Sequence, residues 1–508
     1  MNYPFWDVDI GYGILMAAIA VVHVMVSHFA IGGGLYLVVA EHFARKANDV
    51  YRLQFLERLS KFFVLVTVVF GALTGVGIWF IIGLLNPAAT EVLIHNFVWG
   101  WATEWTFFVI EILAALLYYY GWKKLSARNH LIIGWIYFIA AWMSLFVING
   151  IITFMLTPGD WLTTGSFWDG FFNPTLWPSL VLRTGICILM AGLFTLLVAG
   201  RQYPDEKKRG LVRYNAWWGL LGLIITLPSF WWYFKSIPAD IRTAAQEMMP
   251  FVMQRVDQTY WFIAALAVVL IVFGLILPKR YNLAIGIVGL ALGLVFFGEY
   301  EWLREAIRKP YVVHGYMYGN ALEVAQQDAY LESGYLEHMV FTTDDPGADL
   351  YRRACRSCHT IDGYKALKPF FEGTDEEFIA GIVRGTGVMK GNMPPWFGTE
   401  EESQLLAAHI YKQIDQRHVS EIYGLSGVEL GEKAYELRCS GCHEIGGFND
   451  KFASLVGLAE EDYSDMLDMA GDFAEEMPAF TGDEVERAAL IQYLMTLEEG
   501  GQDATAGL

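Results

Sequence analysis

The sequence predicts an all-α protein in which an eight-helix transmembrane bundle is followed by two small tandem domains outside the membrane. The N-terminal part contains long apolar runs that exceed the roughly 18–20 residues needed to cross a bilayer. Charge is divided unevenly. Residues 311–508 hold 13 Lys and Arg against 36 Asp and Glu, a net charge of −23, and the whole-chain charge of −19 therefore leaves +4 for residues 1–310. The acidic part also contains one cysteine motif twice.

Eight apolar runs are expected to cross the membrane, near residues 12–41, 62–85, 98–121, 131–155, 178–200, 215–234, 259–278 and 281–299. The loops after the first, third, fifth and seventh runs carry 15 basic residues, whereas the intervening loops hold only Lys235, Arg242 and Arg255. Because basic loops stay in the cytoplasm, the N-terminus is expected outside, and eight spans return the chain to that side. The first run lacks a preceding basic segment and a cleavage site, so we expect a retained helix.

Two copies of the motif Cys-x-x-Cys-His lie 84 residues apart, with the residues Cys355, Cys358 and His359 in the first and Cys439, Cys442 and His443 in the second. Two cysteines at this spacing can add to both vinyl groups of one haem, and the adjacent histidine can then bind the iron. A single motif would also be compatible with a redox dithiol or half of a zinc site. The repetition favours two covalently bound haem c groups. The fifth cysteine, Cys187, is expected to be a buried small side chain.

A methionine before a proline follows each motif, Met393 in Gly-Asn-Met-Pro-Pro-Trp and Met477 in Glu-Glu-Met-Pro-Ala-Phe. A thioether opposite a histidine raises the reduction potential of haem iron because it favours the ferrous state. We therefore predict that His359 and Met393 bind the first iron, and His443 and Met477 the second. The alternatives are the other nearby methionines, Met389, Met466 and Met469.

Both units have a Gly and a Tyr before the motif and an aromatic-bearing helix after the methionine, as in Gly347 and Tyr351 of the first unit. In these features they resemble class I cytochrome c domains. The expected division of the chain is a membrane part (1–299), a connector (300–345), cytochrome c domain 1 (346–422), cytochrome c domain 2 (423–498) and a disordered tail (499–508).

Polar groups inside the apolar runs are costly and are treated as functional candidates. His23 is a candidate haem ligand, with a packing histidine as the alternative; His28 lies five residues later and on another face. Glu104 and Glu111 are seven residues apart and nearly stack on one helix face, so they can form a proton path, or else a pair satisfied by hydroxyls. Arg183 needs a carboxylate, a haem propionate or water.

The membrane part resembles subunit I of the cytochrome bd-type oxidases. His23 matches the haem-ligand histidine of the family's first helix, and Glu104 and Glu111 precede an aromatic-Gly-Trp end at Tyr118-Tyr-Tyr-Gly-Trp. The segment that starts at Glu299, Glu-Tyr-Glu-Trp-Leu-Arg-Glu-Ala-Ile-Arg-Lys-Pro-Tyr, is similar to the family's Glu-x-x-Arg-x-Pro-Trp segment. The resemblance implies that His23 and Glu299 bind membrane haem iron and that Glu104 and Glu111 carry protons. It also implies that one or two b- or d-type haems are bound and that a second integral membrane subunit exists.

The departures from the family concern its quinol-oxidising side. The family's fifth helix carries a histidine that ligates a low-spin haem, and the matching position here is Arg183. The partner methionine and its arginine are missing around residues 261–264, and the quinol-binding loop shrinks to about residues 235–257. The oxygen-reducing site, through His23 and Glu299, is therefore better supported than the low-spin haem site.

Three functions are compatible with these features. In the first, a redox partner cytochrome delivers electrons to the c haems, and oxygen is reduced at membrane haems. In the second, quinol is oxidised in the membrane and electrons leave through the c haems. In the third, the bundle binds no haem and anchors a dihaem carrier. The loss of quinol features beside a gain of c haems favours the first.

The expected location is the cytoplasmic membrane of a bacterium, with lipid around the bundle. The N-terminus and both cytochrome c domains are expected on the periplasmic side, where haem is attached covalently. The acidity of the C-terminal part suits either solubility or attraction of a basic redox partner. No nucleic-acid-binding feature is present in the sequence.

Overall fold

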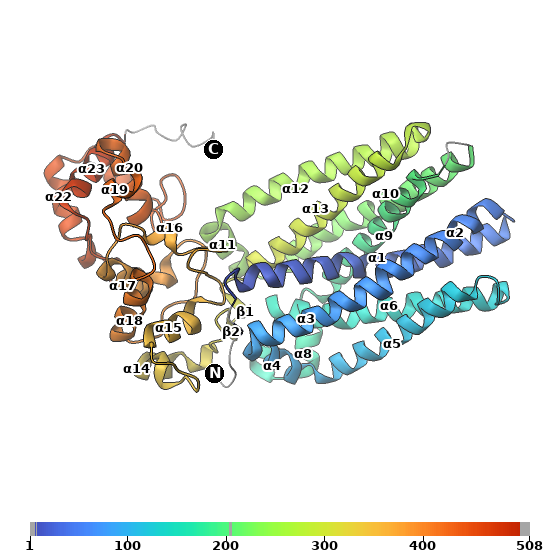
Figure 1. Ribbon diagram of the computed structural model, residues 1–508, viewed down its shortest axis with the longest axis horizontal. Helices are drawn as coiled ribbons and strands as arrows, with labels where there is room; N and C mark the ends of the chain where they lie inside the picture. The colour runs from blue at the N-terminus through green and yellow to red at the C-terminus, as the bar shows by residue number, and fades with distance from the viewer. Residues whose placement is uncertain (1–5, 7, 203–205, 498–508) are drawn as a thin grey trace.

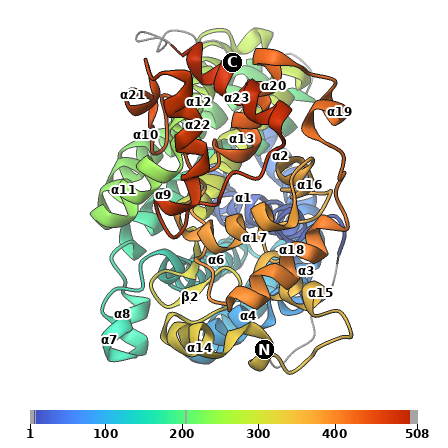
Figure 2. The same ribbon diagram turned by 90° about the vertical axis from the view of Figure 1, so that its left-hand side faces the viewer.

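The computed structural model describes residues 6, 8–202 and 206–497, and it has two parts (Figure 1). Long helices run side by side in a bundle, and shorter helices form a separate body at one end of that bundle, which Figure 2 views end on. In the described residues the only sheet is a two-stranded antiparallel pair. The predicted all-α class is therefore confirmed. The tail at 499–508 lies outside the described residues.

The bundle contains all of the predicted membrane spans. Its elements are α1 (Tyr12–Lys46), α2 (Val50–Val64), η1 (Leu65–Phe70), α3 (Gly71–Leu85), α4 (Pro87–Asn96), α5 (Val98–Gly121), α6 (Ala127–Leu156), α7 (Trp161–Thr164), α8 (Phe167–Phe171), α9 (Leu176–Gly200), α10 (Glu206–Ser236), α11 (Ala239–Met248), α12 (Pro250–Val268), η2 (Val269–Ile276), η3 (Pro278–Arg280) and α13 (Leu283–Ile307).

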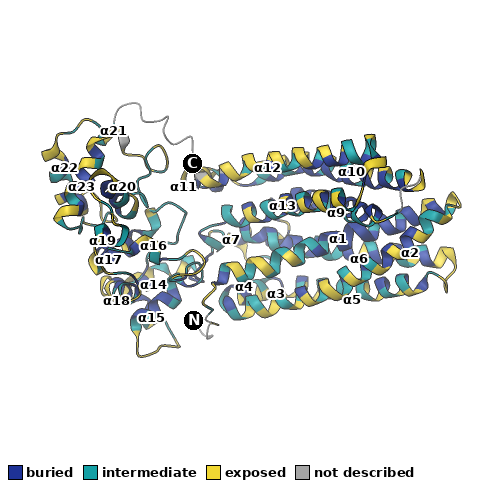
Figure 3. Cartoon of the chain, turned by 45° about the horizontal axis from the view of Figure 1, so that its top comes forward, coloured by how far each residue is buried: buried dark blue, intermediate teal, exposed yellow. Residues whose placement is uncertain are grey.

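Seven helices in the described residues are long and apolar enough to cross a membrane, and α10 with α11, bent by 97°, gives an eighth. The segments α2, η1 and α3 form one continuous span, from Val50 to Leu85. Exposed residues occur along the whole length of the bundle helices (Figure 3). They include many large apolar side chains, such as Leu73, Trp105 and Trp261, as expected where lipid replaces water. The last span continues to Ile307, beyond the predicted end at 299, because its final turns are held by ion pairs rather than by lipid. The protein is an integral membrane protein.

Small residues let the helix backbones approach closely at the centre of the bundle. A Cβ built at Gly32 of α1 would lie 1.8 Å from the carbonyl oxygen of Cys187 on α9. A Cβ at Gly192 would lie 2.4 Å from the backbone nitrogen of Gly219 on α10. Cys187 is only 1% exposed, as expected for a buried small side chain. Contacts of this kind replace the hydrophobic effect as the force between helices in lipid.

The body outside the bundle holds the connector and the two cytochrome c domains. Its elements are β1 (Tyr311–Val313), β2 (Met317–Tyr318), η4 (Val324–Gln326), α14 (Gln327–Glu337), α15 (Pro346–Leu350), η5 (Tyr351–Cys355), α16 (Lys368–Phe371), α17 (Glu376–Arg384), η6 (Gly385–Val388), α18 (Glu400–Tyr411), α19 (Val419–Tyr423), α20 (Gly427–Arg438), α21 (Phe452–Leu455), α22 (Glu460–Asp468), η7 (Ala470–Asp472) and α23 (Glu484–Met495).

The connector is part of domain 1 in structural terms. The buried carboxylate of Glu402 accepts hydrogen bonds from the backbone N–H groups of Tyr335 and Leu336, each at 2.8 Å. The same carboxylate caps the start of α18 by accepting from Thr399 N–H. Tyr330 and Tyr335 of α14 pack into the core of domain 1. The tyrosine-rich composition of the connector therefore reflects burial against this domain.

Replacing Gly32 by Ala should destabilise the bundle, because the new methyl group would overlap the Cys187 carbonyl group and force α1 away from α9. Overpacking of this kind costs about 1–3 kcal/mol. We expect a lower midpoint of thermal unfolding in detergent for Gly32→Ala. Gly83→Ala is the matched control, since a Cβ there meets no atom within 4 Å; an equal loss in both variants would contradict the close α1–α9 contact.

Candidate functional site

The two Cys-x-x-Cys-His motifs have the same local geometry. His359 Nδ1 donates to the carbonyl oxygen of Lys365 at 3.0 Å, and His443 Nδ1 lies 3.3 Å from the carbonyl oxygen of Asn449. In each domain the hydroxyl of the tyrosine eight residues upstream donates to the carbonyl oxygen of the same histidine. Because a carbonyl only accepts, Nδ1 of His359 carries the proton and its Nε2 keeps a free lone pair for iron. His443 Nδ1 also lies 3.2 Å from the side-chain amide nitrogen of Asn449, so its contacts are compatible with either tautomer.

The cysteine environment fits haem better than the alternatives. Burial of the thiols raises the pKa of Cys355 and of Cys439 to about 12, whereas a redox dithiol needs a lowered thiol pKa. No group of three or more His, Cys, Asp or Glu side chains that could hold a metal ion occurs in the part of the chain that the structure describes. A porphyrin supplies four of the six iron ligands itself, so one histidine and one thioether suffice. Bound haem would supply one-electron transfer.

The competing methionines differ in their surroundings: Met389 packs against the core of domain 1 and Met466 against that of domain 2. The methyl group of Met389 lies 2.9 Å from where a Cβ at Gly441 would be, so its side chain points toward domain 2. Met469 is half exposed, at 50%. Met393 and Met477 remain the predicted axial ligands.

Domain 1 is docked on the end of the bundle through its haem-binding motif. The Asn392 side-chain amide, next to the predicted ligand, donates to the carbonyl oxygen of Lys309 just after α13. A Cβ at Gly319 would lie 3.8 Å from the Sγ atom of Cys358. The ring of Tyr364 covers the first turn of α1. Residues close to the first motif are thus in contact with both ends of the membrane part of the chain.

Domain 2 contacts domain 1 on both sides of its own haem site. The backbone N–H of Lys390 donates to the carbonyl oxygen of Gly441, inside the second motif, at 2.9 Å. The side-chain ammonium group of Lys390 lies 3.4 Å from the carboxylate of Glu444. A Cβ at Gly385 would lie 2.5 Å from the carbonyl oxygen of Glu476, the residue before the predicted methionine ligand. The contacts therefore run from the motif of domain 2 to domain 1, and from the motif of domain 1 to the bundle.

His23 has the geometry of a haem ligand within the bundle. Its Nδ1 atom lies 3.1 Å from the Thr74 hydroxyl on α3, and that hydroxyl lies within 3.0 Å of the carbonyl oxygens of Phe70 and Gly71. Since the threonine proton is directed to those carbonyls, its oxygen accepts from the histidine. Nδ1–H is thereby fixed and Nε2 is left able to bind iron.

His28 is held differently and does not fit the same role. Its Nδ1 donates to the carbonyl oxygen of Val24 at 2.8 Å, and its Nε2 accepts from Arg183 at 3.5 Å. Arg183 Nη1 also lies 2.8 Å from Glu301, whose other oxygen accepts from Arg304 at 3.1 Å. The buried Arg183 therefore has a carboxylate partner. The sequence places Glu301 beside Glu299 at the end of the last span, but it did not identify Glu301 as the partner of Arg183.

Glu299, the second predicted ligand of membrane haem iron, lies on α13, which packs against α1, the helix of His23. The two helices approach closely beside Glu299: a Cβ built on its neighbour Gly298 would lie 3.6 Å from the methyl group of Met25, which is two residues after His23. The Glu299 carboxylate faces Arg255 of α12 at 3.4 Å, and the pair is partly open to the outside of the bundle. The structure thus brings both residues to the same pair of helices, with the glutamate held by a weak ion pair.

The two predicted proton-path carboxylates each meet a hydroxyl on α6. Ser144 donates to Glu104 at 2.7 Å, and Tyr137 donates to Glu111 at 3.0 Å. The sequence contained a signal for these partners, because Ser144 and Tyr137 are seven residues apart, as the two glutamates are. The Tyr137 hydroxyl also lies 3.1 Å from the carbonyl oxygen of Ala30 on α1.

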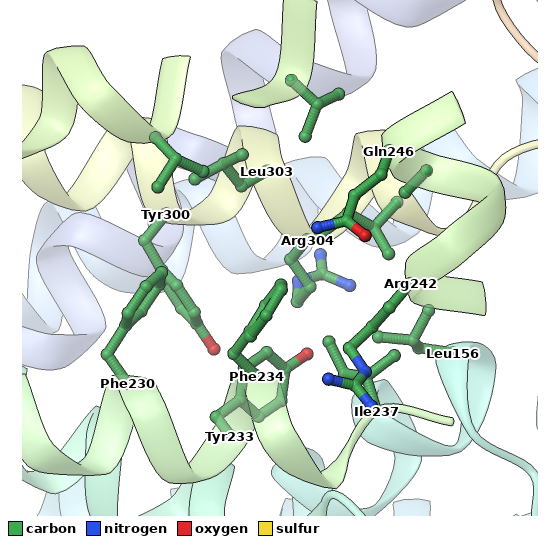
Figure 4. A pocket seen from close by; sticks show the side chains of 14 residues that line it. Leu156, Phe230, Tyr233, Phe234, Ile237, Arg242, Gln246, Tyr300, Leu303 and Arg304 are labelled. Carbon is green, nitrogen blue, oxygen red and sulfur yellow. The ribbon is translucent and has the colours of Figure 1, made fainter. Parts of the chain in front are cut away.

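The segment in the place of the quinol-binding loop forms α11 and the start of α12 and closes a small pocket (Figure 4). The pocket is walled by aromatic rings and carries two arginines, with Phe230, Tyr233, Phe234, Arg242, Tyr300 and Arg304 among its lining residues. Its volume is about 30 Å³. Pockets for drug-sized ligands usually have volumes of about 300–1,000 Å³, so this pocket is small.

A transmembrane bundle that carries two docked haem-binding domains is the architecture of a membrane-bound electron-transfer protein. Residues 14–232 match the family model described as "Cytochrome bd terminal oxidase subunit I", and residues 342–410 and 427–494 match the one described as "Cytochrome C oxidase, cbb3-type, subunit III". The chain is thus similar to cytochrome bd oxidase subunit I in its membrane part and to a cytochrome c family in each of its two C-terminal units, which confirms both resemblances seen in the sequence. These families imply haem c in the C-terminal domains and haem b or d in the bundle.

A solved structure supports the fold of the membrane part. The structure of bd oxidase from Geobacillus thermodenitrificans is similar with a TM-score of 0.54 and 17% sequence identity, over 63% of this chain and 91% of that chain. At this identity the likeness shows the fold alone. No curated protein matches the chain.

Replacing His23 by Ala should remove one non-covalent haem, because the free Nε2 atom that the Thr74 contact preserves would be lost. Pyridine haemochrome spectra of the purified protein count covalent and non-covalent haems separately. His95→Ala, which alters an exposed histidine, is the control and should keep every haem. A His23→Ala variant with a full set of non-covalent haems would show that another residue is the ligand.

Met477→Ala should leave both c haems attached but remove the thioether ligand from one of them. Loss of this ligand lowers the reduction potential of that haem, since the thioether favours ferrous iron. A redox titration followed in the c-type absorbance should show one of two components shifted downward. The exposed Met469 offers a control: Met469→Ala should leave both components in place, and a shift there instead would reverse the assignment.

Proposed function

We propose that the chain is a membrane-bound multihaem cytochrome of respiratory electron transfer in which electrons enter at the cytochrome c domains and reduce oxygen within the bundle. His359, Met393, His443 and Met477 would hold the iron of two covalently attached haem c groups, and His23 and Glu299 would hold haem iron in the membrane. The cytochrome c domains lie on the periplasmic side, where haem is attached. A second integral membrane subunit accompanies the chain, as the family resemblance implies.

The docking of domain 1 carries this proposal. Asn392, next to the predicted ligand Met393, touches Lys309 after α13, and Tyr364, five residues after His359, touches the start of α1. These are the two helices on which Glu299 and His23 lie. Domain 2 reaches domain 1 through its own motif. An electron that arrives at domain 2 therefore has a protein path through domain 1 to the bundle.

The alternative in which quinol delivers electrons has less support. At the position of the family's low-spin haem ligand, Arg183 is engaged by Glu301 and His28. The pocket near the shortened loop holds about 30 Å³. Glu104 and Glu111, with their hydroxyl partners on α6, would supply protons to the oxygen site, a role that a haem-free membrane anchor would not need.

The charge of domain 2 indicates what kind of donor fits it. Residues 423–498 contain 17 acidic and 4 basic side chains. The first turn of α22 alone carries three acidic residues. Such a surface attracts a basic partner and speeds its association at low salt. The proposed donor is therefore a basic redox protein, such as a small cytochrome, that docks on domain 2.

Oxygen uptake with different donors tests the proposal. The purified, haem-loaded protein should consume oxygen with a reduced basic cytochrome as donor at a rate at least ten times that with quinol. The haemochrome spectra should contain non-covalent haem beside haem c. A preparation that contains only haem c, or one that is faster with quinol, would contradict the proposed function.

Salt provides a second test of the donor site. The rate with the basic cytochrome should fall at least tenfold between low salt and about 0.5 M, because screening shortens the reach of the acidic surface. A small uncharged reductant serves as the control, and its rate should stay constant. Equal salt dependence for both donors would mean that the acidity serves solubility alone.

A further inference from the structure

Helices α5 and α6 carry a polar ladder with a regular seven-residue spacing. On α5 the residues are Glu104, Glu111 and Tyr118, and on α6 they are Ser144, Tyr137 and His130. The two helices run antiparallel, so each member of one series meets its counterpart in the other. The contacts are Ser144 to Glu104 at 2.7 Å, Tyr137 to Glu111 at 3.0 Å, and His130 Nε2 to the Tyr118 carbonyl oxygen at 2.8 Å. The sequence interpretation had included only the two glutamates.

The third level of the ladder also contains a carboxylate, contributed by α1. Glu41 accepts from the Tyr118 hydroxyl at 2.7 Å, and His130 Nδ1 lies 2.8 Å from it. Both Glu41 and His130 have 0% exposure. Arg45, one turn further along α1, donates to the same carboxylate at 2.6 Å, and its side chain is 26% exposed.

The geometry requires a shared proton in this cluster. His130 Nε2 faces a backbone carbonyl, which can only accept, so Nε2 carries a hydrogen. Its Nδ1 faces a carboxylate, so one hydrogen also lies between Nδ1 and Glu41. The pair is therefore either imidazolium with carboxylate or imidazole with carboxylic acid. Both forms hold the same proton, and interconverting them moves it along one short hydrogen bond.

Two glycines make room for the tyrosines of the ladder. A Cβ at Gly34 of α1 would lie 2.2 Å from the ring of Tyr137, and one at Gly134 would lie 3.0 Å from the ring of Tyr118. The rings thus lie in the interior between the helices. There the hydroxyls are kept at fixed positions, as proton transfer over hydrogen-bond distances requires.

The ladder runs along the bundle from its far end toward His23. Glu41 and Arg45 lie in the last turns of α1, at the end away from the cytochrome c domains (Figure 1). Tyr137 contacts Ala30, seven residues after His23 on the same helix. Successive levels are about 10 Å apart along the axis, at 1.5 Å per residue. Water or side-chain rotation must therefore carry the proton between levels.

We propose that Glu41, His130 and Tyr118 form the proton-loading cluster of the path, taking up protons at the end of the bundle opposite the cytochrome c domains and passing them to Glu111 and Glu104. Tyr137 is the positioning residue for Glu111. This inference rests on the proposed function, because a path is needed only if protons are consumed in the bundle. Each group accepts one proton from the preceding member of the path and releases one proton to the next. It therefore returns to its starting protonation state, and no net charge accumulates within the membrane.

Proteoliposomes test the cluster directly. The haem-loaded protein is inserted with its cytochrome c domains outside, and a pH dye is trapped in the lumen. Oxygen reduction driven by an external reduced cytochrome should make the lumen alkaline. His130→Gln and Tyr118→Phe should slow this alkalinisation roughly ten- to hundredfold, in the range for loss of a positioned acid–base group, with unchanged haem content and unchanged cytochrome c reduction.

Thr106→Val is the matched control, since it removes an exposed hydroxyl on α5 that bonds only to its own helix. Tyr137→Phe adds a nearly isosteric variant at the middle level in case His130→Gln folds poorly. Alkalinisation at the wild-type rate in Tyr118→Phe, a nearly isosteric variant of the cluster itself, would overturn the cluster. A wild-type protein that consumes no oxygen would instead contradict the proposed function, so the two failures are distinguishable.

Discussion

The buried ion pair between Arg183 and Glu301 limits what the membrane half can do. Removing one partner of such a pair typically costs about 3–5 kcal/mol, because the other charge stays buried without compensation. The pair ties α9 to α13 at 2.8 Å and also occupies the Nε2 atom of His28. A position that in the bd family resemblance belongs to a haem ligand is thus used for a fixed structural contact.

The rest of the proposed function follows from that constraint. With the low-spin site filled by side chains, electrons need another way into the bundle, and domain 1 is docked where α1 begins and α13 ends. Protons would come from the opposite end, through the ladder between α5 and α6. Both routes lead toward the depth of His23, whose Nε2 atom is kept free by its Thr74 contact. In the proposed function, electron and proton supply are therefore separated in space.

Much of this organisation could be predicted from the sequence. The apolar runs predicted the membrane bundle, and the repeated cysteine motif predicted the C-terminal domains. Both could be recognised because each depends only on residues that are close together in the sequence. The partners of Arg183 and Glu111 could not be identified, since they depend on which helix faces α9 or α5 in space. The polar ladder could be predicted only in part. Tyr137 and Ser144 have the same seven-residue spacing as the two glutamates, but the sequence does not show that α5 and α6 pack antiparallel, which is what brings the two pairs together. Glu41 came from a third helix, about 77 residues before Tyr118.

The most direct test of the central claim is a single turnover without any donor. The fully reduced protein is mixed with oxygen, and the absorbance of haem c and of the membrane haems is followed in time. If the cytochrome c domains feed the bundle, haem c should be oxidised within the same turnover, after the membrane haems. Asn392→Ala removes the hydrogen bond between domain 1 and the Lys309 carbonyl group, and it should therefore slow the oxidation of haem c. Haem c that stays reduced while the membrane haems are oxidised would contradict the account.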